Sequence, residues 1–488
     1  MRSISLKHPR AFYIDGAWVA PMSGATVPVR DCATEAVVAE VALAQDEDMR
    51  RAVAAARRAF DEGPWPRMTP AERAVYLDRI AARFEALNDA FAAVWSVESG
   101  IVYKVAQPRI GLFLSGAFRQ YAAMATSFVF TETHRSMTGN LAHKVHEPVG
   151  VAAVIVPWNG PAGLMAYKVA PALLAGCTVV VKSPVEAPCS GHLFAEICED
   201  VGLPAGVVNV ITADRDVSQA LVAHPDVDKI TFTGSTAAGR AIGAVAAQRM
   251  ARVTLELGGK SAAILCDDFD TDTAVRTLGA GFFGYLSGQV CHAPTRVIVP
   301  RARHDAVVAG LCAVARTMVL GDPFDPATTM GPLASARQRE TVERYVASGV
   351  AQGAHLACGG QRPAAPNSGF FFEPTVFGNV DPAMTIAQEE IFGPVLSVIP
   401  ADSEDDAVRI ANGTIYGLNA VVFTNDRDKA LSMARRLRSG TVGQNASRTD
   451  FTIGFGGMKQ SGIGREGGPE GLSAFLETKT IVLDAPAA

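Results

Sequence analysis

The sequence is poor in charged residues and in cysteine. Charged residues make up 19% of the 488 residues and hydrophobic residues 49%, and the formal net charge is −5. This composition excludes intrinsic disorder, which requires low hydrophobicity and high net charge. Because no long basic run is present, we expect neither nucleic acid nor an anionic membrane as a partner. Eight cysteines are too few for a disulfide scaffold, so we expect reduced thiols and a cytoplasmic location.

The sequence also lacks the long apolar run of a membrane span. Its longest apolar stretch without charge covers residues 169–181, which is too short and contains Pro171 and Gly176. Residues 1–10 carry no apolar segment of the kind that marks a secretory signal. No two cysteines have CxxC spacing and no histidines cluster, so we expect no metal site.

Short β-branched runs alternate with alanine-rich stretches from residue 150 onward. Continuous apolar strands separated by helices are typical of a parallel sheet that helices cover on both faces. We therefore predict an α/β fold with a doubly wound nucleotide-binding domain, followed by a second strand–helix series after residue 258. Helices are predicted over 48–60 and 70–95, and a last strand, at 479–484, is expected to pair with another element or another subunit. The predicted strands are 151–156, 177–182, 207–211 and 229–233 in the first series, and 261–266, 296–300, 396–400 and 419–424 in the second.

A glycine-containing turn, GSTAAG at 234–239, follows one of these strands and opens a helix. Its outer glycines have the spacing of a dinucleotide-binding fingerprint, in which backbone N–H groups and a helix N-terminus face phosphate. Thr236 stands where that fingerprint has its middle glycine. On this motif alone, an ordinary strand-to-helix turn is as good an interpretation as a phosphate site.

Glu256 lies in an apolar, glycine-rich segment, LELGG at 255–259. The fingerprint places a ribose-binding acid about twenty residues after its turn, where Glu256 falls. Burial there would also raise the pKa of the carboxyl group, as suits a general base. A plain surface glutamate is a third interpretation, and the local sequence does not choose among the three.

Cys291 follows small residues in SGQVCH at 287–292, a composition that suits a tight turn and an exposed thiol. A nucleophilic cysteine needs a positive or dipolar environment to hold its thiolate. Taken singly, a buried hydrophobic role is the commoner one for any of the eight cysteines. A dyad with His292 is disfavoured, because adjacent side chains in an extended segment point in opposite directions.

Six motifs that occur in one order decide between these interpretations. The motifs are PWN at 157–159, GSTAAG at 234–239, ELGGK at 256–260, GQVC at 288–291, EEIFGP at 389–394 and FGGMKQSG at 455–462. Together they resemble the NAD(P)-dependent aldehyde dehydrogenase superfamily, and the resemblance runs from about Tyr13 to Lys479. It implies an enzyme that oxidises an aldehyde to the carboxylic acid through a thiohemiacetal and a thioester on a cysteine.

The resemblance assigns the chemistry to four residues. Cys291 takes the place of the nucleophile, and Asn159 together with the backbone N–H of Cys291 would hold the oxyanion. Glu256 takes the place of the general base that activates the hydrolytic water, which overrules the ribose interpretation. Lys168 matches a lysine that relays protons from this base.

The resemblance also implies a nicotinamide dinucleotide as cofactor. NAD is the expected form, although Val185 replaces a glutamate of the family motif and leaves NADP possible. The implied cofactor residues are Lys182 at the adenosine ribose, Gly234 and Ser235 at the pyrophosphate, Glu390 at the nicotinamide ribose, and Trp158 and Phe392 as lining residues.

The family places the walls of its aldehyde tunnel next to Asn159 and just before the nucleophile. Large side chains are scarce in the first of these segments, and neither arginine nor lysine occurs over 160–167 or 285–291. We therefore expect medium-to-large apolar aldehydes, and no cation that grips a carboxylated one. The implied tunnel residues are Gly163, Tyr167, Tyr285 and Leu286.

The family architecture implies three parts and a homodimer or homotetramer. A Rossmann-type cofactor domain would comprise 1–125 and 148–258, an α/β catalytic domain 259–462, and a small β oligomerisation arm 126–147 and 463–488. One alternative is a non-catalytic structural or binding protein on the same fold, which need not retain a nucleophile, an oxyanion donor and a base together. Another is a coenzyme A-acylating relative, which has less need of a water-activating base.

Overall fold

The centre of the molecule is a parallel sheet with the strand order β11–β10–β7–β8–β9. The computed structural model describes residues 4–484. Every residue of β7, β9 and β10 is buried, which explains why these strands lack the alternating polar pattern of an exposed sheet. Short antiparallel strands extend both edges, β1 and β2 beyond β9 and β19 beyond β11. The strands are β1 Phe12–Ile14, β2 Ala17–Val19, β7 Val151–Ile155, β8 Thr178–Ser183, β9 Val208–Thr212, β10 Lys229–Thr233, β11 Arg252–Glu256 and β19 Gly462–Ile463.

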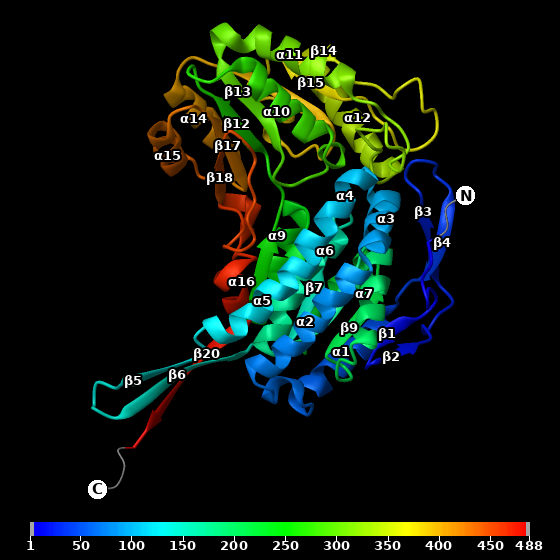
Figure 1. Ribbon diagram of the computed structural model, residues 1–488, viewed down its shortest axis with the longest axis vertical. Helices are drawn as coiled ribbons and strands as arrows, with labels where there is room; N and C mark the ends of the chain where they lie inside the picture. Colours follow the sequence, from blue (N-terminus) through cyan, green and yellow to red (C-terminus); the bar gives the residue numbers. More distant parts are fainter. Residues whose placement is uncertain (1–3, 485–488) are drawn as a thin grey trace.

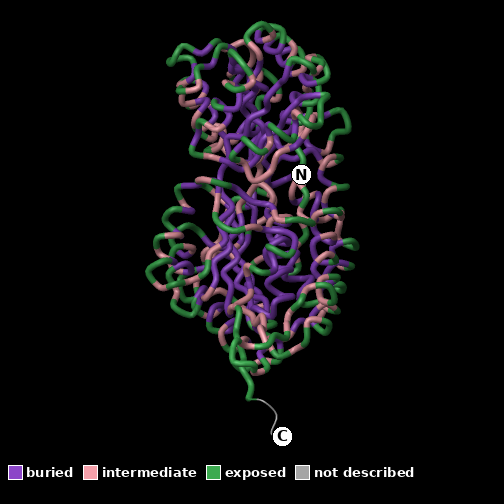
Figure 2. The backbone as a smooth tube through the Cα atoms, turned by 90° about the vertical axis from the view of Figure 1, so that its left-hand side faces the viewer, coloured by how far each residue is buried: buried purple, intermediate pink, exposed green. Residues whose placement is uncertain are grey.

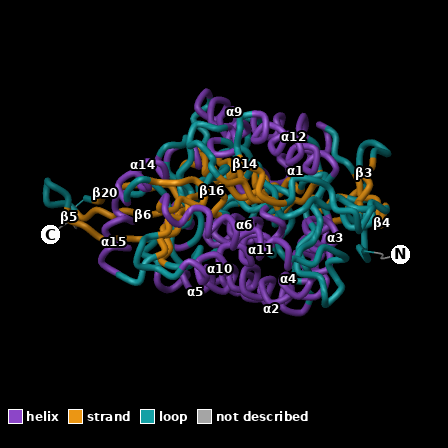
Figure 3. Tube along the Cα trace, turned by 90° about the horizontal axis from the view of Figure 1, so that it is seen from above, coloured by secondary structure: helices purple, strands orange, loops and turns teal. Residues whose placement is uncertain are grey.

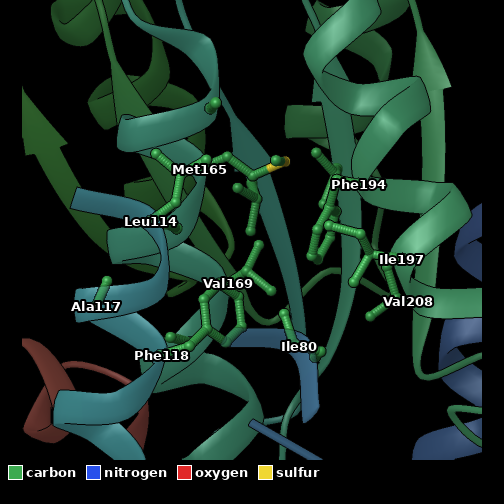
Figure 4. Close-up of a cluster of buried hydrophobic side chains, with 14 of the residues drawn as sticks. Ile80, Leu114, Ala117, Phe118, Met165, Val169, Phe194, Ile197 and Val208 are labelled. Atoms are coloured by element: carbon green, nitrogen blue, oxygen red, sulfur yellow. The ribbon is translucent and has the colours of Figure 1, made fainter. Parts of the chain in front are cut away.

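Helices cover both faces of this sheet, as the strand–helix alternation predicts. Seen from above, helices lie on either side of the layer of strands (Figure 3). On one face, side chains of α2, α5, α6 and α7 form a continuous apolar cluster (Figure 4). On the other face lie α1, α8 and α9. The predicted helix over 70–95 is instead two helices, because the chain turns at Leu87 and packs Phe84 against Phe91, with ring centroids 5.0 Å apart. The helices are α1 Asp46–Asp61, α2 Pro70–Ala86, α3 Asn88–Ser99, α4 Tyr103–Ile110, α5 Gly116–Ser127, α6 Pro161–Ala175, α7 Cys189–Asp200, α8 Arg215–Ala223 and α9 Thr236–Gln248.

A second sheet, in the order β14–β15–β16–β13–β12–β17–β18, carries the later strand–helix series. The four strands predicted there are confirmed as β12, β13, β16 and β17, within two residues at each end. Among residues 4–484, no helix has the length and apolarity that crossing a membrane requires. The strands are β12 Ser261–Leu265, β13 Pro294–Pro300, β14 His355–Cys358, β15 Thr375–Gly378, β16 Val395–Ala401, β17 Asn419–Phe423 and β18 Thr441–Gln444. The helices are α10 Thr271–Phe283, α11 His304–Thr317, α12 Ala336–Ala351, α13 Thr385–Gln388, α14 Glu404–Asn412, α15 Arg427–Arg436 and α16 Gly468–Ser473.

A three-stranded antiparallel sheet projects from the body of the molecule (Figure 1). In it β20, Leu476–Leu483, pairs along its whole length with β6, Leu141–Pro148, which also pairs with β5, Thr131–Arg135. The predicted pairing of the last strand with another element is therefore confirmed. Most of these residues are exposed or half-buried (Figure 2). Association of subunits through this sheet stays a prediction, as do the three domain ranges, whose ends at 1–3 and 485–488 lie outside the described residues.

The two large sheets meet at a seam formed by the end of β11 and the segment after it. The chain leaves β11 at Glu256, builds the second sheet, and returns to add β19, so that Glu256 pairs with Gly462. Ser461 Oγ donates to Gly258 O at 2.7 Å, although the two residues are 203 apart in sequence. The strand order of the first sheet reverses between β7 and β10. Where the strand order of a parallel sheet reverses, the carboxyl ends of the two central strands leave room for a ligand. Here these carboxyl ends lie on the same side of the sheet as the seam.

Candidate active site

Cys291 follows a turn that the backbone makes in an unfavourable conformation. Residues 286–288 all have positive φ, of 54°, 54° and 74°. For residues with a Cβ atom, this left-handed region costs about 1–2 kcal/mol each. Ser287 holds the turn by donating from Oγ to Gly331 O at 2.7 Å. Gly288 has no substitute here, because a Cβ atom would overlap a backbone oxygen of the EEIFGP motif.

A buried glutamine fixes Cys291 after this turn. Gln289 donates from Nε2 to Leu286 O at 2.9 Å and accepts on Oε1 from the backbone N–H of Ala334 at 2.9 Å. On the other side, a Cβ atom at Gly259 would overlap Cys291 O. The second glycine of the ELGGK motif therefore lets the backbone of the seam pack directly against the turn of Cys291.

The structure brings Asn159 to the same turn. Asn159 lies between β7 and α6, and its Nδ2 donates to Gln289 O at 3.0 Å. Trp95 Nε1 donates to Asn159 O at 2.8 Å and fixes the backbone of this segment. An amide nitrogen carries two N–H groups, so the second one of Asn159 can donate to an oxyanion formed at Cys291.

The Cys291 thiol is in an environment that favours its neutral form. Burial raises the pKa of Cys291 to about 12, and the charges of Glu390 and Glu256 act in the same direction, against the backbone N–H groups of Cys291 and His292. The sequence disfavours a dyad with His292, yet His292 Nδ1 lies 4.0 Å from Cys291 Sγ, because the two residues occupy a turn. Burial lowers the pKa of His292 to about 4, so its ring is neutral at pH 7 and supplies no charge to hold a thiolate.

Glu256 is a buried carboxyl group at the end of β11. Only 3% of the residue is exposed, and neither carboxyl oxygen has a hydrogen-bond partner among residues 4–484. Burial raises the pKa of Glu256 well above its usual value, and the carboxyl group of Glu466 adds to the rise. Gly456 of the FGGMKQSG motif makes room for this group, since a Cβ atom there would overlap Glu256 Oε1. The surface interpretation of Glu256 is therefore wrong, and its raised pKa suits a general base.

A buried ion pair lies next to Glu256. Lys168 on α6 pairs with Glu466 and donates from Nζ to Thr233 Oγ1 at 2.6 Å. Thr233 is in turn the strand partner of Glu256. Beside the larger effect of burial, the charge of Glu466 raises the pKa of Glu256 and the charge of Lys168 lowers it, so the two members of the pair act on this carboxyl group in opposite directions. Sequence reasoning missed Glu466, although REGG at 465–468 places it, like Glu256, in a glycine-rich segment.

Four of the predicted cofactor residues lie at the carboxyl ends of neighbouring parallel strands. Trp158 follows β7, Lys182 lies near the end of β8, and Gly234 and Ser235 follow β10. Ser235 caps α9, because its Oγ accepts from the backbone N–H of Ala238 at 3.2 Å. Burial lowers the pKa of Lys182 to about 8, and no carboxylate among residues 4–484 forms an ion pair with it. Its ammonium is thus free to bind a ligand.

Glu390 and Phe392 approach this edge from the second sheet. Glu390 Oε1 accepts from the backbone N–H of Gly259 at 3.0 Å, and burial raises the pKa of Glu390 to about 7. The ring of Phe392 stands edge-on to that of Trp158, with centroids 5.4 Å apart and planes at 87°. An ammonium without an ion pair among the described residues, a helix N-terminus and a half-buried carboxyl group along one edge fit the hydroxyl and phosphate groups of a dinucleotide.

A cavity of about 450 Å³ adjoins Cys291 and Asn159. Its wall includes all four predicted tunnel residues, Gly163, Tyr167, Tyr285 and Leu286. It also includes Arg109 of α4, which corrects the expectation that the tunnel offers no cation. The segments 160–167 and 285–291 could not reveal a side chain that comes from another helix. Other lining residues that the sequence did not predict are Trp95, Ile110, Phe113, Leu114, Phe282, Phe451 and Phe455.

Comparison with known proteins identifies the family. The family model described as "Aldehyde dehydrogenase family" matches residues 18–481. The chain belongs to the aldehyde dehydrogenase family. Among its relatives, geranial dehydrogenase of Castellaniella defragrans is 41% identical over 480 residues, which cover 98% of this chain and 100% of that protein.

Solved structures of other aldehyde dehydrogenases have the same fold. The Mycobacterium tuberculosis enzyme in complex with NAD+ is 42% identical, with a TM-score of 0.96 and coverage of 99% of this chain and 100% of that one. A cysteine-to-alanine mutant of aldehyde dehydrogenase C from Pseudomonas syringae, in complex with NAD+ and octanal, is 41% identical, with a TM-score of 0.95 and coverage of 100% and 99%. The predicted superfamily and fold are confirmed. As a member of this family, the protein oxidises aldehydes to carboxylic acids with a nicotinamide dinucleotide.

Proposed function

We propose that this aldehyde dehydrogenase uses NAD to oxidise aldehydes with a medium-to-large apolar body, and that Cys291 is its covalent nucleophile. The observation that carries the proposal is that Cys291 and Asn159 line one cavity, while the buried carboxyl group of Glu256 acts electrostatically on the thiol. A nucleophile, an oxyanion donor and a base are the groups that oxidation to a free acid requires.

The groups of the chain itself perform the covalent steps. The Cys291 thiol gives its proton to a water molecule as the sulfur attacks the aldehyde carbon, and the electron pair of the C=O bond moves to the carbonyl oxygen, which becomes an oxyanion. Asn159 Nδ2 and the backbone N–H of Cys291 donate to this oxygen. When bound, the nicotinamide supplies the acceptor for the hydride that the tetrahedral carbon loses. Glu256 then takes a proton from water, whose oxygen displaces Cys291 from the thioester and releases the acid.

Lys168 gives the proton on Glu256 a way out of the buried site. The carboxyl group of Glu256 has no hydrogen-bond partner among residues 4–484, so it needs a neighbour that can receive its proton. The Lys168 ammonium contacts both Glu466 and Thr233, the strand partner of Glu256. Because an ammonium has no lone pair, Lys168 passes one of its own protons to the Glu466 carboxylate as it takes up the proton from Glu256. We assign the relay to Lys168 on the basis of these contacts.

The cofactor would be held by Lys182, Ser235 and Glu390. The proposed preference for NAD over NADP rests on another residue, Glu186. Burial lowers the pKa of Lys182, and the carboxylate of Glu186 opposes this shift, so a negative charge lies near the lysine assigned to the adenosine ribose. A carboxylate there repels a 2′-phosphate. The two related structures described above contain NAD+. Values of kcat/KM with both cofactors test the preference, and an advantage of roughly tenfold for NADP would overturn it.

The cavity favours a long apolar substrate, because aromatic and aliphatic side chains form most of its wall. Among the relatives are a geranial dehydrogenase and a complex with octanal. Each further buried methylene should add up to ~0.8 kcal/mol, roughly a fourfold gain in kcat/KM, until the cavity is full. We expect medium-to-large aliphatic, terpenoid and aromatic aldehydes to exceed acetaldehyde and succinate semialdehyde. A series of straight-chain aldehydes from two to ten carbons tests this, and a flat or falling kcat/KM would refute it.

A coenzyme A-acylating activity is the alternative that the site argues against. Transfer to a thiol has less need of a base that activates water, whereas Glu256 is buried and its charge acts on Cys291. Product analysis in the presence of coenzyme A separates the two, because acyl-CoA in place of free acid would refute hydrolysis. A non-catalytic protein on the same fold would leave every aldehyde in the series unoxidised.

We further propose that the protein is a cytoplasmic homodimer or homotetramer. The sheet of β5, β6 and β20 leaves Leu141, Val482 and Leu483 exposed, and such apolar side chains on a projecting sheet favour a contact with another subunit. Seven of the cysteines among residues 4–484 form no disulfide, which suits a reducing compartment; these are Cys177, Cys189, Cys198, Cys266, Cys291, Cys312 and Cys358. Light scattering gives the molar mass in solution, and a monomer at micromolar concentration would contradict the assembly.

A further inference from the structure

Arg109 places a cation on the wall of the aldehyde cavity. It lies in the last turn of α4, and its side chain is half-buried. The guanidinium carbon is 4.9 Å from the ring centroid of Tyr285, which lines the same cavity. Nη1 donates to Val105 O at 2.8 Å, and no Asp or Glu among residues 4–484 forms an ion pair with the guanidinium.

The hydrogen bonds of Arg109 leave most of its donors without an acceptor among residues 4–484. A guanidinium has five N–H groups, and a partly buried cation is costly unless neighbouring groups compensate it. The buried Arg296 shows how this chain satisfies such a group: it donates to three backbone oxygens, at 2.9, 2.9 and 2.7 Å. Among residues 4–484, Arg109 donates to one backbone oxygen and contacts the Tyr285 side chain. The cavity wall around it also includes Ile110 and Phe113, whose side chains cannot accept a hydrogen bond.

Tyr285 links this cation to the surroundings of Cys291. Burial raises the pKa of the Tyr285 phenol, so its hydroxyl stays protonated at pH 7 and can donate a hydrogen bond. The charge of Arg109 opposes this rise and that of Cys291 adds to it, so the phenol lies within electrostatic reach of both residues. Tyr285 also directly precedes the left-handed turn at 286–288 that leads to the nucleophile. A substrate attached at Cys291 would extend into this cavity. Its other end would then meet the donors of Arg109 and Tyr285 on the cavity wall.

We propose that Arg109 and Tyr285 form a subsite for a carboxylate at the far end of the aldehyde, so that the substrates include ω-oxo carboxylic acids with an apolar middle. This inference rests on the function proposed above and specifies its substrate class. The planar fork of arginine matches a carboxylate with two parallel hydrogen bonds, and the Tyr285 hydroxyl adds a donor. The apolar wall would take the methylene chain between the two ends. A short oxo acid such as succinate semialdehyde lacks that chain.

Matched pairs of aldehydes test the subsite. We would measure kcat/KM with NAD for octanal and 8-oxooctanoate, and for the pairs of six and ten carbons, in the wild type and in Arg109→Met. Methionine keeps an unbranched stem but removes the charge and the donors. The loss of a charge-assisted pair should lower kcat/KM for the best oxo acid by roughly tenfold or more, while octanal changes by less than about threefold. Arg109→Lys should restore part of the loss, since it restores the charge without the fork.

A second arginine provides the control. The Arg79 guanidinium lies 5.5 Å from the ring centroid of Tyr76, a similar stacking contact, but Arg79 is on α2 and is exposed. Arg79→Met should change neither substrate. Equal losses on octanal and 8-oxooctanoate in Arg109→Met would show a structural role and overturn the proposal, as would an unchanged kcat/KM for every oxo acid.

Binding of octanedioate, the eight-carbon dicarboxylate, tests the subsite without turnover. Isothermal titration should show that Arg109→Met weakens its binding by roughly tenfold, with octanoate affected less. A wild-type protein that oxidised no aldehyde would refute the proposed function, yet this titration would still decide the role of Arg109. Equal affinity of the wild type and the variant for octanedioate would overturn the subsite.

Discussion

Glu256→Gln should separate the two halves of the reaction. Glutamine has nearly the shape of a protonated glutamate, and burial already raises the pKa of Glu256 well above its usual value, so the fold should tolerate the change. Neither carboxyl oxygen has a hydrogen-bond partner among residues 4–484, so the substitution removes no hydrogen bond between described residues. The amide cannot take a proton from water, whereas attack by Cys291 and loss of the hydride depend on it less. Hydrolysis of the thioester should therefore become the slow step.

The expected size of the effect follows from the role of a base. General-base catalysis contributes about 10²–10⁴-fold, so steady-state kcat should fall by at least ~10²-fold. After one turnover with octanal and NAD, intact-mass measurement should show an octanoyl group on the variant and none on the wild type. Addition of Cys291→Ala should abolish this adduct. Normal turnover of Glu256→Gln with no adduct would show that Glu256 is not the base.

Glu98→Gln is the matched control for this substitution. Burial raises the pKa of Glu98 to about 7, and its Oε1 accepts from the backbone N–H of Cys189 at 2.9 Å, a bond that a glutamine oxygen can keep. Glu98 is not among the residues that line the aldehyde cavity. Its variant should turn over normally and carry no acyl group. A comparable loss in both variants would mean that removing any buried carboxyl group damages the enzyme.

The raised pKa of Glu256 also fixes the direction of two pH effects. The base works only as a carboxylate, so hydrolysis in the wild type should increase as the pH rises through its pKa, whereas Glu256→Gln should lack this increase. A carboxyl group with a raised folded-state pKa stabilises the fold while it is protonated. That contribution is complete below the unfolded-state pKa of about 4.3 and is lost as the pH rises toward the folded-state value. Urea unfolding from pH 5 to 9 should therefore show a smaller loss of stability in the variant.

Three further measurements test other parts of the site. Lys182→Ala should raise the KM for NAD by about tenfold while kcat changes little, and an unchanged KM would remove Lys182 from the cofactor site. Because burial raises the pKa of Cys291 to about 12, iodoacetamide should label it roughly tenfold faster per pH unit from pH 7 to 9 in cofactor-free protein, and a plateau below pH 8 in the mass spectra would contradict that pKa. Gly163→Leu should shorten the preferred aldehyde chain, because Gly163 lines the cavity and the nearest atom to an added Cβ is 4.0 Å away. An unchanged chain-length optimum would place the substrate elsewhere.

The buried strands of the fold are predictable because burial on both faces leaves continuous apolar runs. The strands β7, β9 and β10 are of this kind, and their predicted positions agree with the structure within a residue. The division of 70–95 into two helices is not predictable in this way. It depends on the packing of Phe84 against Phe91, a tertiary contact that overrides the local preference for one helix.

The active site is predictable where a motif carries each residue. Asn159, Glu256 and Cys291 come from three ordered motifs, and the structure brings Asn159 and Cys291 to one cavity with the charge of Glu256 in reach of the thiol. Arg109 and Glu466 come from segments outside these motifs. Glu466 pairs with Lys168 across 298 residues, and no local pattern in the sequence indicates a partner at that distance.

The pairing of β19 with β11 makes the surroundings of Glu256 a late product of folding. Closing a chain segment of roughly 200 residues costs more entropy than closing a local one, so we expect this pairing to follow the formation of each sheet. During synthesis, β11 emerges from the ribosome long before β19, and its edge stays unpaired in the interval. An unpaired edge strand is a template for contacts with other chains. Pairing of Gly462 with Glu256 thus closes the surroundings of this carboxyl group and covers the edge of β11 in the same event.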